Sequence, residues 1–240
     1  MTEKFVFHPA HERGHVNHGW LNARHSFSFA SWQNPQKVHF GALRVLNDDI
    51  VAPGMGFGTH PHDNMEIITI PLKGELEHKD SMGNIGRISE NEIQMMSAGS
   101  GITHSEYNPN ADREVNLLQI WIFPLVRNIT PRYNQVRLNP EDRKNKFQQV
   151  ISPDGNPVGM NINQRAFFQL ADMQPGTALS YTIQINGNGL YAFLIEGAVT
   201  INNQHQLGKR DALGIWDINE LHVQATEEAH LLLMELPMVF

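Results

Sequence analysis

Short apolar runs separated by polar residues recur along the whole chain, and a regular helical spacing of apolar residues is hard to find. Apolar runs of about four to eight residues, bounded by Gly, Asn, Pro and Asp, are typical of β-strands. The pattern therefore predicts an all-β fold, either a sandwich or a barrel. The predicted strands are residues 42–46, 66–72, 76–79, 93–97, 116–123, 181–185, 190–195, 198–201, 212–215 and 230–236.

Polar and glycine-containing segments between these strands predict turns and one domain boundary. Asp48 and Asp49 are expected to form a turn, as are residues 73–74, 81–84 and 100–101. Residues 124–149 are rich in Arg, Asn, Lys and Pro, and Asn-Pro-Glu-Asp at 139–142 resembles the opening of a helix. We therefore expect an N-terminal domain of residues 1–135 and a C-terminal domain of residues 136–240.

The two halves share a weak internal repeat. Each contains an apolar strand, a turn glycine and a second strand, and the two glycines, Gly74 and Gly197, are 123 positions apart. Similarity at a fixed offset is the signature of a repeated structural unit. We therefore expect two copies of one β-module.

Composition narrows the functional classes. Of 240 residues, 40% are hydrophobic and 18% are charged, as in globular proteins. The net charge of −7 argues against direct binding to nucleic acid or to anionic membranes. The first residues show no apolar leader and no apolar run is long enough to span a membrane, so a cytoplasmic protein is expected. Without cysteine, any bound metal must use nitrogen and oxygen ligands.

Histidine is the residue type that suggests chemistry, because ten of the 13 histidines lie at or before His104. His60 and His62 are separated by one residue at the start of a predicted strand. Residues i and i+2 of a strand point to the same face about 6.6 Å apart, so both imidazoles could bind one ion at about 2.1 Å. Pro61 lacks an amide donor and favours a strand beginning or a sheet edge.

A second pair with the same spacing is formed by His104 and Glu106. A single His-x-His pair most often belongs to surface or turn structure. The addition of a His-x-Glu pair favours a metal site of three imidazoles and one carboxylate. This set resembles the two-histidine, one-carboxylate arrangement of non-haem Fe(II) proteins with one imidazole added. One divalent metal per chain is expected, with Fe(II) favoured and Ni, Cu, Mn and Zn also compatible.

Other polar residues were weighed against these four. Glu66 shares the parity of His60 and His62 on an unbroken strand, so it is a competing ligand or a group that orients an imidazole. His78 lies beyond the turn at Gly74 and is expected to be structural. At the offset of 123, His60 and His62 correspond to Ile183 and Ile185, which predicts that the C-terminal domain lacks metal ligands.

The same segments resemble a known family. Residues 54–74 resemble the first cupin motif and residues 101–108 the second, although seven residues rather than six separate Glu66 from Gly74. That departure is typical of pirins, as are Asn-His-Gly-Trp at 17–20, Arg-Val-Leu-Asn-Asp-Asp at 44–49 and Met-Ser-Ala-Gly-Ser-Gly-Ile at 96–102. The chain thus resembles the pirin family over essentially its whole length. It is most similar to bacterial pirin-like proteins assigned as quercetin 2,3-dioxygenases.

This resemblance implies two tandem cupin domains, each a jelly-roll β-barrel, with metal in the first one only. The ligands would be His60, His62, His104 and Glu106. The implied activity is a dioxygenase that cleaves flavonols such as quercetin with O2 and releases carbon monoxide, with Glu106 as the general base. Its expected partners are a small aromatic substrate and O2, and a protein partner is left open.

Two other functions stay open on the sequence alone, because fold does not fix function. The same family includes a nuclear iron protein that modulates transcription factors, so a non-catalytic, iron-dependent redox sensor that binds protein partners is one alternative. The other is a cupin isomerase or hydrolase that uses the metal as a Lewis acid.

Overall fold

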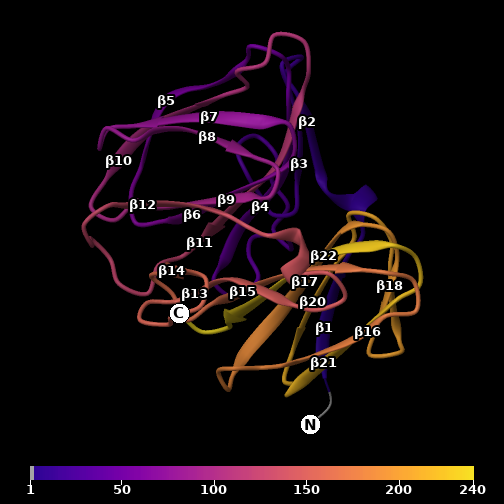
Figure 1. The fold of residues 1–240 in the computed structure, drawn as a ribbon. Coiled ribbons are helices and arrows are strands. Elements are labelled where there is room, and N and C mark those ends of the chain that lie inside the picture. Colours follow the sequence, from indigo (N-terminus) through magenta and orange to yellow (C-terminus); the bar gives the residue numbers. More distant parts are fainter. Residues whose placement is uncertain (1–2) are drawn as a thin grey trace. The chain divides into compact units, whose positions relative to one another are not determined.

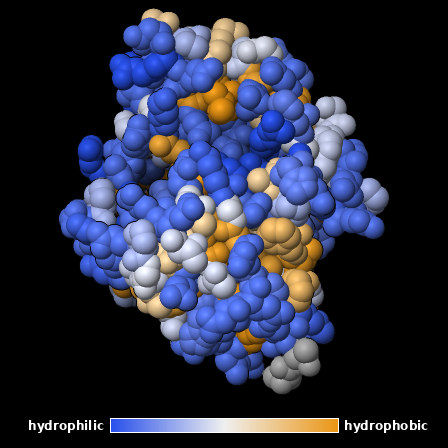
Figure 2. Space-filling model, turned by 90° about the vertical axis from the view of Figure 1, so that its right-hand side faces the viewer, coloured by the Kyte–Doolittle hydropathy of each residue, from blue (hydrophilic) through white to orange (hydrophobic). Residues whose placement is uncertain are grey.

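The structure is a computed structural model that describes residues 3–240, and it is almost entirely β. The helical segments of this part of the chain are two 3-10 turns, η1 (Ala10–Glu12) and η2 (Pro140–Asp142). Neither is long and apolar enough to cross a membrane. The all-β prediction is confirmed, and the face drawn in Figure 2 is mostly hydrophilic, with hydrophobic residues in small patches.

The chain divides into two compact units. One contains Arg13–His39 and Leu43–Leu138, and the other contains residues 3–12, Phe40–Ala42 and Asn139–Phe240. The boundary predicted after residue 135 stays a prediction. The first strand of the chain lies with the C-terminal unit, where its last residue, His8, is buried with Nδ1 2.9 Å from the hydroxyl of Tyr191.

The N-terminal unit consists of a large and a small antiparallel sheet, seen in the upper half of Figure 1. The small sheet has the order β5 (Gly56–His62), β10 (Ile102–Tyr107), β7 (Glu75–Asp80) and β8 (Ile85–Ser89). The large sheet has the order β12 (Arg132–Arg137), β9 (Glu92–Ser97), β6 (Glu66–Lys73), β11 (Val115–Ile122), β4 (Leu43–Val51), β3 (Leu21–His25) and β2 (Gly14–Asn17).

The apolar side chains of alternate residues in these strands fill the space between the two sheets. Leu76 of the small sheet packs in one buried cluster with Leu117 and Val51 of the large sheet. Burying such side chains stabilises a fold by about 1.5–3 kcal/mol each. The result is a closed barrel whose inner face carries residues from both sheets.

The C-terminal unit repeats this plan with one seven-stranded and one four-stranded sheet. The large sheet is β1 (Lys4–His8), β20 (Ala212–Trp216), β17 (Asn188–Glu196), β22 (Ala229–Pro237), β15 (Phe167–Met173), β13 (Gln148–Pro153) and β14 (Met160–Ile162). The small sheet is β16 (Ala178–Thr182), β21 (Glu220–Ala225), β18 (Val199–Ile201) and β19 (His205–Leu207).

The turn glycines of the predicted repeat occupy equivalent places. Gly74 (φ 79°) joins β6 to β7, and Gly197 (φ 83°) joins β17 to β18. Both have the left-handed conformation that favours glycine. A Cβ atom on Gly74 would lie 3.1 Å from the carbonyl oxygen of Glu114, and one on Gly197 would overlap the carbonyl oxygen of Glu228.

Substituting Gly197 with alanine should therefore destabilise the protein strongly. The methyl group would collide with rigid backbone and the residue would keep a strained φ, at a combined cost of about 3 kcal/mol or more. In a chain of this length, that lowers Tm by roughly 6–12 °C. Gly83→Ala is the control, because Gly83 also has a positive φ (95°) but a Cβ there meets nothing within 4 Å. Equal Tm losses in the two variants would contradict this account.

Two predictions about local structure are wrong. Asp48 and Asp49 do not form a turn but lie inside β4, where Asp48 accepts hydrogen bonds from Arg13 (3.3 Å) and Asn116 (2.8 Å). These partners allow a carboxylate to occupy a buried strand. The strand predicted at 181–185 ends at Thr182, because the amides of Gln184 and Ile185 donate to the buried carboxylate of Glu235 instead of to a neighbouring strand.

The segment between the two halves is only partly as predicted. Asn139 caps the short helical turn η2, its side chain accepting a hydrogen bond from the amide of Glu141, as its sequence indicates. The same segment also contains β12, an edge strand that pairs with β9. Its burial pattern is intermediate or exposed throughout, which explains why no apolar run marked it.

Candidate metal centre

Two neighbouring strands of the small sheet bring the three predicted histidines together. His60 of β5 is directly opposite His104 of β10, and His62 is opposite Ile102. Directly opposed residues and residues i and i+2 share one face of a sheet, so all three imidazoles point into the barrel. The register shifts between His104 and Glu106 at a bulge, so that Glu106 is opposite Phe57. Bulges re-aim side chains and are common beside functional sites.

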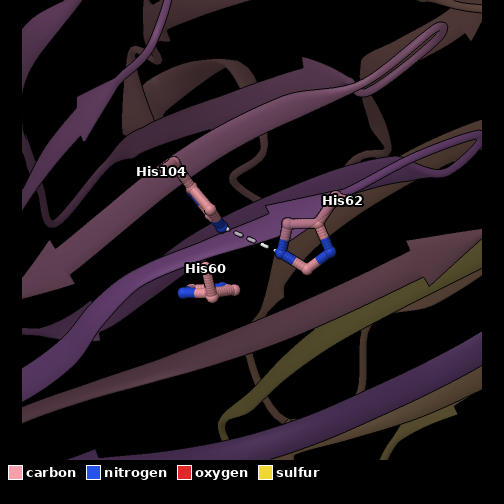
Figure 3. Close-up of side chains that lie close together, drawn as sticks. All are labelled: His60, His62 and His104. Carbon is pink, nitrogen blue, oxygen red and sulfur yellow. Dashed lines mark hydrogen bonds between the residues drawn. The ribbon is translucent and has the colours of Figure 1, made fainter.

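The three rings point toward one another (Figure 3). Their centroids are 4.5 Å apart for His60 and His104, and 4.8 Å apart for each of the other two pairs. One nitrogen of each ring lies within 4.8 Å of a nitrogen of the other two, and the Nε2 atoms of His62 and His104 are 3.0 Å apart. The expected clustering of these imidazoles is therefore present in the fold.

Burial and mutual repulsion keep the rings of His62 and His104 neutral. Burial, followed by the neighbouring imidazoles, lowers the pKa of His104 to about 2, and burial and His60 lower the pKa of His62 to about 4. A neutral imidazole offers a lone pair to a metal ion, whereas a protonated one does not. Two of the three rings are thus in the form that binds metal at neutral pH.

The contacts of these rings fit a bound cation. His60 Nδ1 lies 2.8 Å from the carbonyl oxygen of Gly58, which fixes Nδ1 as the donor and leaves Nε2 free to bind metal. The Nε2 atoms of His62 and His104, 3.0 Å apart, are close enough to bind one ion at about 2.1 Å each.

Glu106 is buried on the inner face of β10, but its carboxylate is directed to the large sheet. It accepts hydrogen bonds from Gln119 Nε2 at 3.1 and 3.3 Å and from Thr69 Oγ1 at 3.4 Å. Burial raises its pKa to about 7, and these two hydrogen bonds oppose the rise. The group of residues close enough to share an ion contains the three histidines without Glu106, so its role as a ligand stays a prediction.

Glu66 does not share a strand with His60 and His62. Asn64 has a positive φ (45°) in the connection between β5 and β6, and these strands belong to different sheets. Glu66 is fully buried and its Oε2 accepts a hydrogen bond of 2.7 Å from Ser97. It lies three positions from Thr69, and so on the opposite face of β6 from the residue that binds Glu106. The proposal that Glu66 orients an imidazole stays a prediction.

Two neighbours of the site, Thr69 and Gln119, escaped the sequence reasoning, and both hold Glu106. His78, expected from the sequence to be structural, has its ring 5.2 Å from that of His104. Alternation along the strand gives the face on which each of these side chains lies. It does not give the register between strands, which brings residues distant in sequence into contact.

A cavity of about 480 Å³ opens beside His62, whose ring also packs edge-on against Trp121 at 4.9 Å. Its volume is within the range of sites for small organic molecules. Its lining residues are Pro61, His62, Asp63, Ser81, Ser100, Gly101, Ile102 and Thr103. Among the three clustered histidines, His62 is therefore the one that borders this space.

The same barrel contains an aspartate whose ionisation is costly. Asp49 is 5% exposed and its Oδ1 has no hydrogen-bond partner. Burial, followed by the negative charges of Asp48 and Glu106, raises its pKa to about 8 from an ordinary value of 3.8. The folded protein therefore keeps a proton that the unfolded chain releases above about pH 4, and its stability falls as pH rises from about 4 to 8.

Asp49→Asn should remove this pH dependence in the metal-free protein. Asparagine is neutral in the folded and in the unfolded state. The Tm of the variant relative to wild type should therefore rise from about pH 4 to 8. The rise should be roughly 4–8 °C if the substitution removes about 2 kcal/mol of destabilisation. Asp48→Asn is the control, because it breaks a buried ion pair with Arg13 and should lower stability throughout this range. Thermal unfolding from pH 5 to 9 measures both, and a pH-independent Tm difference for Asp49→Asn would refute the assignment.

Two protein-family models match the chain. The pirin model covers residues 6–122, and the model of the quercetinase C-terminal cupin domain covers residues 149–236. The fold is accordingly two cupin domains, as the sequence resemblance implied.

Known proteins agree with these matches over nearly the whole chain. A quercetin 2,3-dioxygenase of Escherichia coli strain K12 is 42% identical over 234 residues, which cover 96% of this chain and 97% of the relative. A pirin-like protein of Caulobacter vibrioides is 37% identical over 230 residues, 95% of this chain and 97% of the relative. The crystal structure of the E. coli pirin YhhW in complex with nickel(II) is 40% identical, has a TM-score of 0.93 and covers 98% of this chain and 100% of that one. This chain therefore belongs to the pirin family.

Proposed function

We propose that this protein is a metal-dependent dioxygenase that cleaves a flavonol-like substrate with O2 and releases carbon monoxide. The observation that carries the proposal is the convergence of His60, His62 and His104, of which His62 lines a cavity of about 480 Å³. The name of the E. coli relative, quercetin 2,3-dioxygenase, supports the reaction class. The nickel(II) complex of the related pirin supports a metal-binding role for the family.

In this proposal, His60, His62 and His104 hold one divalent metal, with Glu106 as a fourth ligand or as a base beside it. Imidazole and carboxylate ligands suit Fe(II), Ni(II), Mn(II) and zinc alike. Fe(II) remains the first choice. When bound, the metal would supply Lewis acidity toward a substrate hydroxyl and the redox chemistry that O2 requires.

The chain's own residues would bind and deprotonate the substrate. Glu106 is the buried carboxylate nearest in sequence to the triad, and it would accept the proton of the substrate's 3-hydroxyl group at a carboxylate oxygen. Thr69 and Gln119 fix its orientation by donating hydrogen bonds to it. Trp121, packed edge-on against His62, would provide an aromatic wall for a flat substrate.

Aerobic incubation of the metal-loaded protein with quercetin, followed by gas analysis, tests the proposal. We expect carbon monoxide in amounts that match quercetin consumed, and none above background from His104→Ala. Metal-loaded protein that releases no more carbon monoxide than this variant would overturn the dioxygenase. In that event, loss of binding to a protein partner on iron oxidation would identify the regulatory alternative, and anaerobic turnover would identify a Lewis-acid enzyme.

A further inference from the structure

A fourth histidine of the same barrel has no assigned role. His78 of β7 is fully buried, and neither ring nitrogen has a hydrogen-bond partner. Its ring stacks on Tyr133, with centroids 5.0 Å apart and an interplanar angle of 22°. Leaving a buried polar group unpaired costs about 1–3 kcal/mol, so a structural histidine normally has at least one partner. Packing alone therefore does not account for an imidazole at this position.

The register of the small sheet places His78 beside the metal-binding strand. β10 lies between β5 and β7, and His104 is opposite His60 on one side and Asp80 on the other. His78 is directly opposite Glu106 and so shares the inner face of the sheet with it. His78 thus approaches His104 from the side away from β5, which explains why it is not one of the three clustered ligands.

His104 also has a buried ring nitrogen without a partner. Its Nε2 faces His62, while its Nδ1 is buried and makes no hydrogen bond. Metal-bound histidines almost always donate the second ring N–H to a neighbouring acceptor, which fixes the ring and increases its basicity. His60 satisfies this rule through the carbonyl of Gly58. For His104, the neighbouring imidazole that lacks a partner is His78, 5.2 Å away between ring centroids.

We propose that His78 is a positioning residue of the metal centre. A neutral imidazole has one acceptor nitrogen, and in His78 this nitrogen accepts the Nδ1–H of His104, directly or through one buried water. The hydrogen bond holds the His104 ring with Nε2 toward the cation. This inference rests on the proposed metal centre but not on the dioxygenase reaction.

Cobalt(II) binding to purified full-length protein tests the inference, with affinity measured by chelator competition and coordination by the visible absorption spectrum. His78→Phe keeps a ring on Tyr133 and removes both nitrogens. It should weaken cobalt binding by about 10–100-fold and shift the visible bands. The Tm of the metal-free variant should change little, because the apolar ring removes two polar nitrogens from the core while His104 Nδ1 loses one acceptor. His78→Gln, whose Oε1 can accept the same hydrogen bond, should regain part of the affinity.

His25→Phe is the matched control. His25 is also buried in this barrel with an unpartnered Nδ1, but its ring contacts Phe29. The His25→Phe variant should keep the wild-type affinity for cobalt and the wild-type visible spectrum. Three results would each overturn the inference. The first is wild-type cobalt affinity in His78→Phe, and the second is an equal loss of cobalt affinity in His25→Phe. The third is a loss of cobalt affinity in His78→Phe that accompanies a fall in the metal-free Tm and that His78→Gln does not restore. A wild-type protein that binds no cobalt would instead refute the metal centre itself, and this inference with it.

Discussion

Replacing His62 with alanine should weaken divalent metal binding by roughly a hundredfold or more. Apparent binding free energies of about 10–16 kcal/mol, shared among four ligands, correspond to about 2.5–4 kcal/mol for each ligand. His62 is only partly buried, so its removal should disturb the fold less than removal of the buried His104. Isothermal titration of the metal-free protein with nickel(II) measures the loss.

The control for this variant is His222→Ala. The His222 side chain is 59% exposed in the C-terminal unit and interacts with Ser180 and Glu220. This variant should bind nickel with wild-type affinity and a stoichiometry of one per chain. If both variants bind nickel as the wild type does, His62 is not a ligand and the proposed centre is wrong.

Replacing Glu235 with glutamine should destabilise the C-terminal unit by about 3–5 kcal/mol. Glu235 is fully buried, and Tyr181 Oη (2.8 Å) and the amide of Gln184 (2.9 Å) both donate to Oε2. The amide of Ile185 and Asn188 Nδ2 donate to Oε1, each at 2.9 Å. Whichever oxygen becomes an NH2 group would face two donors and leave them unpaired, and hydrogen bonds to a charged group are worth about 1.5–3 kcal/mol each.

Thermal unfolding measures this effect, with an expected fall in Tm of roughly 6–20 °C. Tyr181→Phe is the comparison, because it removes one donor and keeps the carboxylate with the other three. It should lower Tm by less than half as much. A Glu235→Gln protein as stable as Tyr181→Phe would show that this network does not hold the segment between β16 and β17.

Short apolar runs bounded by turn residues predicted several core strands of each unit, but they missed β15 (Phe167–Met173), which is almost entirely buried. The strand expected at 66–72 is β6 (Glu66–Lys73), and the one expected at 93–97 is β9 (Glu92–Ser97). Both contribute fully buried side chains, such as Ile68 and Met96. The pattern succeeds where burial determines which face of a strand each residue occupies.

The pattern fails where a paired strand is mostly exposed. β12 lies at a sheet edge and none of its residues is buried, and β1 is mostly exposed and pairs with β20 from the far end of the chain. Asp48 and Asp49 look like turn residues, but Arg13 and Asn116 supply the partners that let Asp48 lie in β4. Such partners come from other strands, so composition near the residue does not reveal them.

More of the candidate site than of these edge strands could be predicted from the sequence. The i, i+2 spacing brings His60 and His62 onto one face, and the pairing of β10 with β5 places His104 beside them. The structure brings the three imidazoles close together, while their role as metal ligands stays a prediction. Glu106 and His78 depend on the register between β10 and β7, which the spacing within each strand does not determine.

The most direct test of the metal centre is anomalous diffraction from crystals of the nickel-loaded protein, recorded at the nickel absorption edge. We expect one strong peak per chain, about 2.1 Å from the Nε2 atoms of His60, His62 and His104. A peak at other residues, or stoichiometric nickel in the protein without a peak at these three imidazoles, would contradict the account.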